Sequence, residues 1–473
     1  ARSGLQITSL RADMVATNVA NASTPGYVRR SVQVSENVLA GSTAGVRSDG
    51  VSRSQNQSLT AERRNLTSDL AQADVLSSTW RTISSMVGDT AEGTGLFKAF
   101  GNFESALSNL ALSPESGADA SAVLTSANAI IQEFHNLSQM TVSLRTEADR
   151  EISQGRDIVN TALQTIETLN GRISGIDRTT GEAAALIDER NRVLDTISEY
   201  LPVQAVPRNY GMIDVVTPEG VFLLAGTARQ VEFNTSSSFG PAQTVENGAL
   251  SGLSVDGISL TPGSSSYGAV SSGLFGALFT LRDQDLPTFS AQLDTLAGDF
   301  ISRLSDDTID PTKTPGDPGL FVDPMGTGDP GLASRIAINA AVDPAQGGAT
   351  WRLRDGIGAV AQGPTGDSTI LNNMLGAIKL VSPISSNGIQ GSFSSTEMAA
   401  QFASLTGQKR VQNEGILSST SAQHTMLIEA EQSENGVDID SQMQDLILIE
   451  QAYAANARVI EIASQMINRL MEI

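Results

Sequence analysis

The closing stretch, Ile439 to Leu470, reads IDSQMQDLILIEQAYAANARVIEIASQMINRL and organises the rest of the chain around it. Apolar or near-apolar residues return in it every three or four positions, with one slip near Met443. This spacing is typical of a coiled-coil seam, although a helix buried in its own domain core is the commoner origin of such a stripe. The seam consists of Met443, Leu446, Ile449, Tyr453, Asn456, Ile460, Ala463, Ile467 and Leu470.

A second apolar row on the same helix widens its apolar face beyond what one partner helix covers. We therefore expect this helix to be contacted from more than one side, and to be marginal by itself. Asp438 and Asp440 follow Gly436 and give an N-terminal cap signal, which explains the two carboxylates without acid–base chemistry. The second row consists of Ile447, Val459, Ile462 and Met466.

The other end of the chain also begins as a helix. Apolar residues at mostly helical spacing predict a helix over 1–22, and because the pattern is already under way at Ala1 we expect further residues upstream. Pro25 and Gly26 should end this helix in a turn, and alternating valines over 28–34 predict a short strand. Residues 36–57 are rich in Ser, Gly and Asn, which indicates a loop or a weak strand.

The middle of the chain alternates between long helices and one β-rich segment. The run over 118–170 predicts a single helix roughly 75 Å long, a rod that a globular enzyme rarely needs. The period changes to two over 203–260, which predicts a β insert. Residues 306–345 are rich in Asp, Pro and Gly and predict a loop, whereas 346–390 give no clear pattern. Helices are predicted over 59–87, 96–112, 118–170, 182–200, 271–306 and 396–434.

These segments predict a mainly α protein with a β insert, an α+β class with a long α-helical coiled-coil bundle made by both halves of the chain. Early and late segments of similar character suggest nested domains. We expect a terminal coiled-coil domain from 1–35 and 436–473, a long-helix rod domain from 36–197 and 273–435, and a β-rich outer domain from 198–272.

Composition limits the possible partners. The 473 residues carry 52 acidic against 30 basic side chains, a formal net charge of -22, which argues against nucleic acid or an anionic membrane as the main partner. Cysteine is absent, so disulfides and thiolate metal sites are impossible. No run of about 20 apolar residues occurs, and no signal peptide opens the chain, so export would use another route.

Chemistry at a catalytic site is poorly supported. His135 and His424 stand without a nucleophile pattern, and zinc or phosphate-loop motifs are missing. An acidic loop could hold a hard cation, but it lacks EF-hand order and a solvated loop is the better interpretation. We therefore expect no enzyme activity, cofactor or metal. The acidic loop carries Asp306, Asp307, Asp310, Asp317, Asp323 and Asp329.

Two terminal motifs resemble a known family. Asn18 to Arg30 reads NVANASTPGYVRR and is similar to the N-terminal signature of the flagellar axial proteins, namely rod, hook and hook-associated proteins. Gly436 to Asp440, with Leu446–Ile447 and the run from Gln451 to Ile460, resembles their C-terminal signature. Segments 186–194, 226–230 and 273–286 are similar to the hook-associated proteins that form the first junction between hook and filament.

The resemblance implies a structural, extracellular part of the flagellum. Terminal helices would form an inner tube in a ring of subunits, with the rods around it and the β domain outside. The implied partners are the hook protein, a second junction protein (hook-associated protein 3), other copies of the chain, and a type III export chaperone on the C-terminal helix. A hook or rod subunit remains an alternative, and so does a secreted adhesin or hydrolase on a helical stalk.

The residues expected at the assembly interface come from both ends of the chain. The turn residues should shape the connection below the tube, and the apolar seam should pack it. They are Asn18, Asn21, Pro25, Gly26, Tyr27, Leu446, Ile449, Tyr453, Asn456, Ile460, Ile467 and Leu470.

Overall fold

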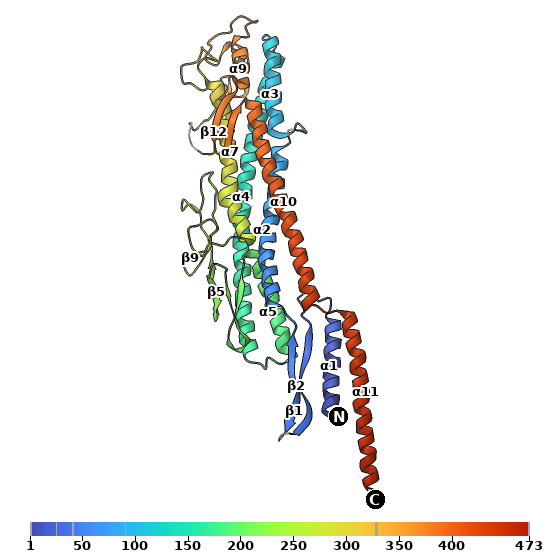
Figure 1. The fold of residues 1–473 in the computed structure, drawn as a ribbon. Helices are drawn as coiled ribbons and strands as arrows, with labels where there is room; N and C mark the ends of the chain where they lie inside the picture. The colour runs from blue at the N-terminus through green and yellow to red at the C-terminus, as the bar shows by residue number, and fades with distance from the viewer. Residues whose placement is uncertain (1, 25, 40–41, 90, 327–329, 472–473) are drawn as a thin grey trace.

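The computed structural model describes residues 2–24, 26–39, 42–89, 91–326 and 330–471. Long helices lie side by side along an elongated body, small sheets lie on one flank, and both chain ends lie beyond its narrow end (Figure 1). The prediction of a mainly α chain with a β insert is confirmed.

The predicted long helices are present with nearly the predicted bounds. The longest, α4, has 58 residues and is therefore about 87 Å long. Its N-terminal N–H groups are capped by Ser116, and a capping box made by Ser394 and Glu397 starts α10. The helices are α2 (Gln57–Val87), α3 (Gly95–Leu112), α4 (Gly117–Ser174), α5 (Gly181–Tyr200), α7 (Leu286–Ser305) and α10 (Ser395–Asn435).

The helix predicted over 271–306 contains a local irregularity. It begins as α6 (Gly273–Thr280), passes through a π-helical turn at Leu281–Asp285, and continues as α7. Such π turns widen the helix by one residue and are frequent at sites with special packing. Here the turn carries the fully buried Arg282.

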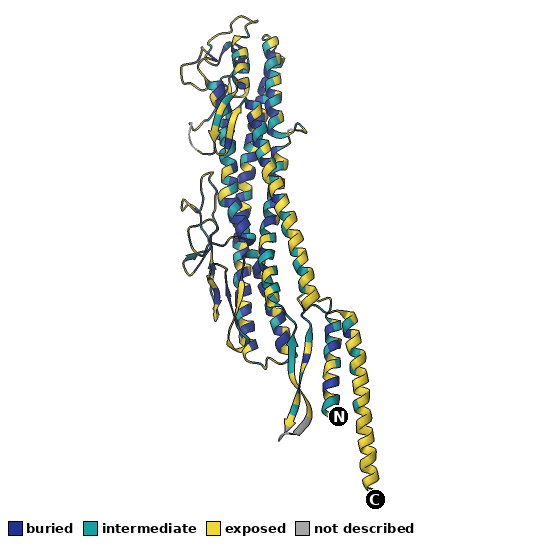
Figure 2. Ribbon diagram, in the orientation of Figure 1, coloured by how far each residue is buried: buried dark blue, intermediate teal, exposed yellow. Residues whose placement is uncertain are grey.

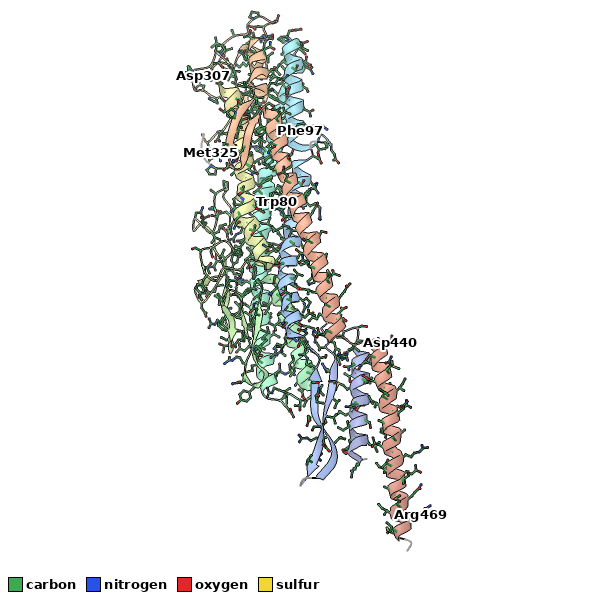
Figure 3. The ribbon with its side chains drawn as sticks, viewed as in Figure 1. Trp80, Phe97, Asp307, Met325, Asp440 and Arg469 are labelled. Atoms are coloured by element: carbon green, nitrogen blue, oxygen red, sulfur yellow. The ribbon has the colours of Figure 1, made fainter. Side chains whose placement is uncertain are left out.

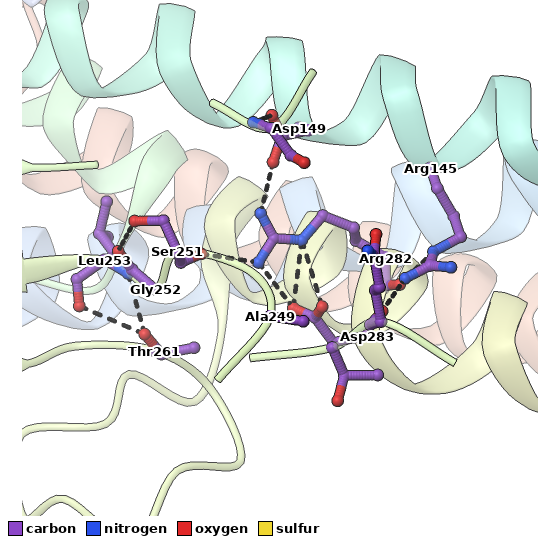
Figure 4. A network of polar contacts seen from close by, with 12 residues as sticks. Arg145, Asp149, Ala249, Ser251, Gly252, Leu253, Thr261, Arg282 and Asp283 are labelled. Atoms are coloured by element: carbon purple, nitrogen blue, oxygen red, sulfur yellow. Dashed lines mark hydrogen bonds and ion pairs between the residues drawn. The ribbon is translucent and has the colours of Figure 1, made fainter. Parts of the chain in front are cut away.

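The body has two main apolar cores that share α4. The first is built around Phe100, Phe134 and Phe300 and uses the α4 residues up to Met140. The second begins at Ala148 on α4 and includes the inner face of the β insert. Between them lies a buried polar network in which Arg145, Asp149 and Arg282 connect α4, the π turn and loops of the insert (Figure 4). The two cores are therefore separated by buried charged groups, of which Arg282 pairs with Asp149 and Arg145 donates to backbone carbonyls.

The β insert consists of two small antiparallel sheets. One has the order β3-β4-β5-β6, and the other β7-β8-β9. Both pack apolar side chains such as Val215, Leu223 and Val255 toward α4 and α6. The strands are β3 (Gln204–Pro207), β4 (Ile213–Val216), β5 (Phe222–Ala225), β6 (Thr227–Ala228), β7 (Val231–Glu232), β8 (Ser254–Val255) and β9 (Ile258–Ser259).

Residues 306–393 cover the other end of the rod. Among its described residues the predicted loop is mostly irregular, with a short strand pair, β10 (Phe321–Val322) and β11 (Ala337–Ile338), and two 3-10 helical turns. The segment without a clear pattern forms α8 (Arg352–Asp355) and α9 (Thr369–Lys379), followed by the hairpin β12 (Ser382–Ser386) and β13 (Ile389–Phe393). Asp307 and Met325 lie on this side of the molecule, while Trp80 lies within the bundle (Figure 3).

The terminal part of the molecule consists of a helix pair and a hairpin. Helix α1 (Arg2–Ala20) lies beside α11 (Ile439–Met471), and β1 (Arg30–Leu39) pairs with β2 (Ser42–Arg53). Of the two alternatives predicted for 36–57, a loop or a weak strand, the strand is confirmed over most of the described residues, because pairing with a neighbouring strand orders a polar sequence with low strand propensity. The boundary expected between residues 35 and 36 lies inside β1; the three-part domain division stays a prediction.

Candidate assembly surface

Helix α11 carries the predicted seam, and α1 covers only part of it. Asp438 starts the helix by accepting a hydrogen bond from the N–H of Asp440 at 3.0 Å, as the cap signal predicted. Leu446, Ile449 and Asn456 are partly buried where α1 runs beside them. Farther along the same seam the side chains of Ile460, Ile467 and Leu470 are exposed. The free end of α11, near Arg469, extends well past α1 (Figure 3).

A second seam on α11 is uncovered over its whole length. Its residues follow one another at intervals of four and three, as in a heptad repeat. Val459, Ile462 and Met466 were recognised in the sequence, whereas Leu448 and two alanines were missed, because alanine gives a weak apolar signal. Small residues at such positions allow another helix to approach closely. The second seam is Leu448, Ala452, Ala455, Val459, Ile462 and Met466, all exposed.

Figure 2 shows how unusual this exposure is within the molecule. Most of α11 is coloured as exposed, whereas the central helices carry buried stripes along their length. Gln442 is the one buried residue of α11. Monomeric proteins rarely leave contiguous apolar surface of this extent in water, so α11 has the character of an interaction surface.

Asn18 is the polar centre that connects the terminal elements. Its side chain is buried, and its amide donates to the carbonyl of Arg30 and to Gln442 Oε1, both at 2.8 Å. The amide oxygen accepts from the hydroxyl of Tyr27 at 2.8 Å and from the N–H of Arg30 at 3.1 Å. One side chain thus joins α1, the following turn, β1 and α11. Burial raises the pKa of Tyr27, so its hydroxyl stays a donor.

The other predicted turn residues have local roles. Asn21 donates from its amide to the carbonyl of Thr17 at 2.9 Å at the end of α1. Gly26 has a φ of +73°, which favours glycine. A Cβ there would also lie 2.8 Å from the Cγ of Arg192, so the Arg192 side chain would have to move. Pro25 lies outside the described residues.

Ion pairs fasten the hairpin and α10 to the rod. Asp188 on α5 is buried and accepts from Arg30 at 2.7 Å and from the Nε of Arg53 at 2.9 Å. Arg63 on α2 pairs with Asp195 on α5 and with Glu431 near the end of α10. Burial lowers the pKa of Arg63, but both carboxylates outweigh that effect and the pKa is raised. Arg63 therefore stays charged and ties α2, α5 and α10 together.

A groove lies between α1, the hairpin and α11. Val15, Val32 and Ile449 contribute apolar surface to it, and Arg11 and Asp445 contribute opposite charges. Leu448 and Ala452 also line it, so the groove is continuous with the second seam.

Comparisons with known proteins agree on one family. The model of the "Flagellar hook-associated protein FlgK helical domain" matches residues 80–310. "Flagella basal body rod protein" matches residues 1–27, and "Flagellar basal body rod FlgEFG protein C-terminal" matches 432–473. Flagellar hook-associated protein 1 of Bacillus subtilis is 21% identical over 504 residues, which span 100% of this chain and 96% of the relative. By these matches the chain is similar to flagellar hook-associated protein 1 over its whole length.

Other proteins named flagellar hook-associated protein 1 match over a shorter length. The Escherichia coli protein is 23% identical over 319 residues, 64% of this chain and 55% of that protein, and the Salmonella typhimurium protein is 23% identical over 318 residues with the same coverage. The solved flagellar hook junction protein FlgK from Burkholderia pseudomallei matches 55% of this chain and 46% of its own, with 18% identity and a TM-score of 0.45.

These similarities identify the chain as a structural subunit of the bacterial flagellum at the junction of hook and filament. The alternative of a hook or rod subunit predicted a chain dominated by β domains, whereas α2 to α5 occupy most of residues 59–200. Within the described ranges, no helix is long and apolar enough to span a membrane.

Carboxylates of the acidic loop form ion pairs and hydrogen bonds within the protein. Asp307 pairs with Lys313, Asp323 pairs with Arg335, and Asp310 accepts from the N–H of Ile357 at 2.6 Å. Asp329 lies outside the described residues. No group of three or more metal-ligating side chains occurs in the part of the chain that the structure describes. The two histidines are also engaged, since His135 contacts the carbonyl of Ile336 and His424 the hydroxyl of Thr67, both at 3.0 Å.

Proposed function

We propose that the protein joins hook to filament by assembling as a ring through α1 and α11, with the hook protein on one side and hook-associated protein 3 on the other. The observation that supports this proposal is the uncovered second seam of α11. α1 occupies the first seam only in part, so a neighbouring copy is left to cover the second. Contacts of this head-to-tail kind close into rings when the rotation between subunits permits.

The energetics favour assembly over an isolated helix end. Fully burying an aliphatic side chain contributes about 1.5–3 kcal/mol, and Leu448, Val459, Ile462 and Met466 are each about half exposed or more in the single chain. Burying the exposed half of these four side chains contributes about 3–6 kcal/mol, which offsets part of the cost of ordering the helix end on assembly. In this proposal the predicted interface residues of the first seam, Tyr453, Ile460, Ile467 and Leu470, also become buried.

The same surface has a role before assembly. We propose that the chain is exported unfolded by the flagellar type III apparatus, and that an export chaperone covers the apolar seams of α11 until then. A helix with two exposed seams would otherwise bind other copies too early. The absence of cysteine is compatible with such transit.

The test uses single substitutions on α11 in cells whose own gene has been deleted. Cells without the protein should make hooks without filaments. Ile462→Asp in the second seam and Ile460→Asp in the first should leave the rod folded and still give no filaments, because a carboxylate would be buried in each contact. Asn468→Asp is the matched control, because Asn468 is exposed and lies in neither seam; it should restore filaments.

Electron microscopy of hooks and filaments measures the result, and circular dichroism of the purified variants confirms their folding. Normal filaments with Ile462→Asp would contradict a role for the second seam. Normal filaments with both substitutions would contradict assembly through α11 altogether.

A further inference from the structure

The packing of α1 on α11 raises a problem of register. The two helices run antiparallel, since Asn18 near the end of α1 contacts Gln442 near the start of α11 and Gly4 lies against Asn456. The first seam of α11 repeats every seven residues with similar apolar side chains. Apolar seams of this kind can slide by one heptad with little loss of contact, so something other than the seam must select one register.

Two positions along the interface are different from the rest. Asn18 and Gln442 form a buried hydrogen bond of 2.8 Å between the helices. Two heptads away on both helices, Gly4 leaves room for the side chain of Asn456, whose Oδ1 would lie only 2.7 Å from a Cβ at residue 4. Both polar positions of α11 therefore meet their matching positions on α1 in the same register.

We propose that the Asn18–Gln442 pair fixes the register of α1 on α11. All four hydrogen-bonding positions of the Asn18 amide are used, and three of them are satisfied by the turn and β1, which hold the side chain in place. Only the fourth faces α11, and Gln442 fills it. Asn18 therefore presents a fixed N–H donor to one position of α11, the position of Gln442.

A slipped register loses this contact. Ile449 lies one heptad along α11 from Gln442, and it would bring an aliphatic side chain to the buried donor of Asn18. A buried N–H without an acceptor shifts such an equilibrium by about tenfold or more. The pair therefore holds the second seam of α11 at one height relative to the hairpin, which is what identical copies need if they are to contact one another in the same way. This register is a property of the single chain and does not depend on assembly.

Engineered disulfides can measure the register, because the chain contains no cysteine. Gly4→Cys with Asn456→Cys reports the observed register, since a Cβ at residue 4 would lie 3.0 Å from the Cγ of Asn456 and two cysteines there are close enough to form a disulfide. Gly4→Cys with Ala463→Cys, made together with Asn456→Ala, reports a slip of one heptad. Both probes remove the bulk of Asn456, and the backbone contacts of Asn435 are the same in all variants, so the change in ratio on substituting Gln442 measures the contribution of Gln442. Oxidation of dilute monomer and gel electrophoresis separate cross-links within a chain from those between chains.

Four substitutions of glutamine are then compared in each probe. Gln442→Leu should lower the ratio of observed to slipped cross-link about tenfold or more. Gln442→Glu keeps an acceptor for Asn18 and should keep the ratio, and so should Gln451→Leu on the exposed side of α11. Gln442→Met is a second apolar variant should the leucine disturb the helix.

Two results would overturn the proposal. One is an unchanged ratio in both Gln442→Leu and Gln442→Met, which would show that packing alone sets the register. The other is the loss of both cross-links together, which would show that the pair holds the helices together without choosing between registers. Neither result bears on whether the second seam binds a neighbouring copy, so this proposal and the proposed ring can fail separately.

Discussion

Replacing Arg282 by methionine is expected to uncouple the β insert from the rod. Arg282 is fully buried in the π turn, and its guanidinium pairs with Asp149 at 2.6 Å and with Asp283 at 2.9 Å. It also donates to the carbonyl of Ser251 at 2.9 Å, a loop residue of the insert (Figure 4). Methionine has a similar length, so the change removes charge and hydrogen bonds with little change of volume.

The expected magnitude follows from the groups left behind. Removing one partner of a buried ion pair costs about 3–5 kcal/mol, because the other partner stays buried without compensation. Burial already raises the pKa of Asp283, and loss of the guanidinium should raise it further. A carboxyl whose folded pKa exceeds its unfolded value lowers stability above that folded pKa, and the penalty disappears as the pH falls below both values. The deficit should therefore be largest at pH 7 and shrink toward pH 4.

Differential scanning calorimetry at several pH values tests this reasoning. A loss of about 3–5 kcal/mol should lower the Tm of the affected unit by roughly 10 °C at pH 7. The double variant Arg282→Met/Asp149→Leu removes one stranded carboxylate and should recover part of the loss. A single variant within about 1 kcal/mol of the original protein, or a deficit that grows on acidification, would refute the argument.

Three further predictions concern other contacts of the rod. Gly155→Ala should destabilise the folded protein by about 1–3 kcal/mol, because a Cβ there would lie 2.8 Å from two aromatic rings. Gly171→Ala on the same helix meets nothing within 4 Å and should stabilise the protein by up to about 1 kcal/mol. Equal urea midpoints for the two variants would count against this reasoning. Asp188→Asn should cost about 3 kcal/mol and make the hairpin at 30–53 sensitive to limited proteolysis, since Arg30 and Arg53 lose their shared carboxylate; an unchanged cleavage rate argues the opposite. Burial, and then the charge of Arg63, lower the pKa of His424, so NMR titration should give His424 a pKa below its ordinary value of about 6.5. The α2–α10 contact should therefore lose stability only as the pH falls below about 6.5, where the imidazole becomes protonated on unfolding. A measured pKa at or above 6.5 would exclude this.

The helices were predictable because their signals are local. The run from Ile152 to Ile173 keeps one apolar face over many turns, and α4 buries that face as predicted. The breaks are local as well, since Pro114 and Pro202 each lie two residues after the last residue of a helix. Such signals act within one or two turns, so they are visible without knowledge of the fold.

The hairpin and its attachment were not predictable in the same way. Strand β2 contains Ser, Gly and Asp at positions that favour loops, and it is ordered by pairing with β1 and by a hydrogen bond of 2.7 Å from the N–H of Val51 to the carbonyl of Thr179. Strand propensity depends on such neighbours more than on the residues themselves. The Arg53–Asp188 pair likewise joins residues far apart in the sequence, so no spacing could indicate it.

The assembly surface divides in the same manner. Heptad spacing predicted the first seam and much of the second, and the resemblance to axial proteins singled out Asn18 and Tyr27. Neither could identify Gln442 as the partner of Asn18, because 424 residues separate them. The interface role of the predicted residues stays a prediction until the α11 variants are measured.

By itself the sequence determined that both ends are amphipathic helices, that long rods lie between them and that a β insert interrupts the rods, because periodicity and turn residues act over short distances. Only the tertiary structure decided which seam of α11 faces α1, which carboxylates the buried arginines pair with, and where along α4 the first apolar core ends and the second begins. Those outcomes depend on which distant surfaces meet, and a buried polar group is stable only where a partner from another element reaches it.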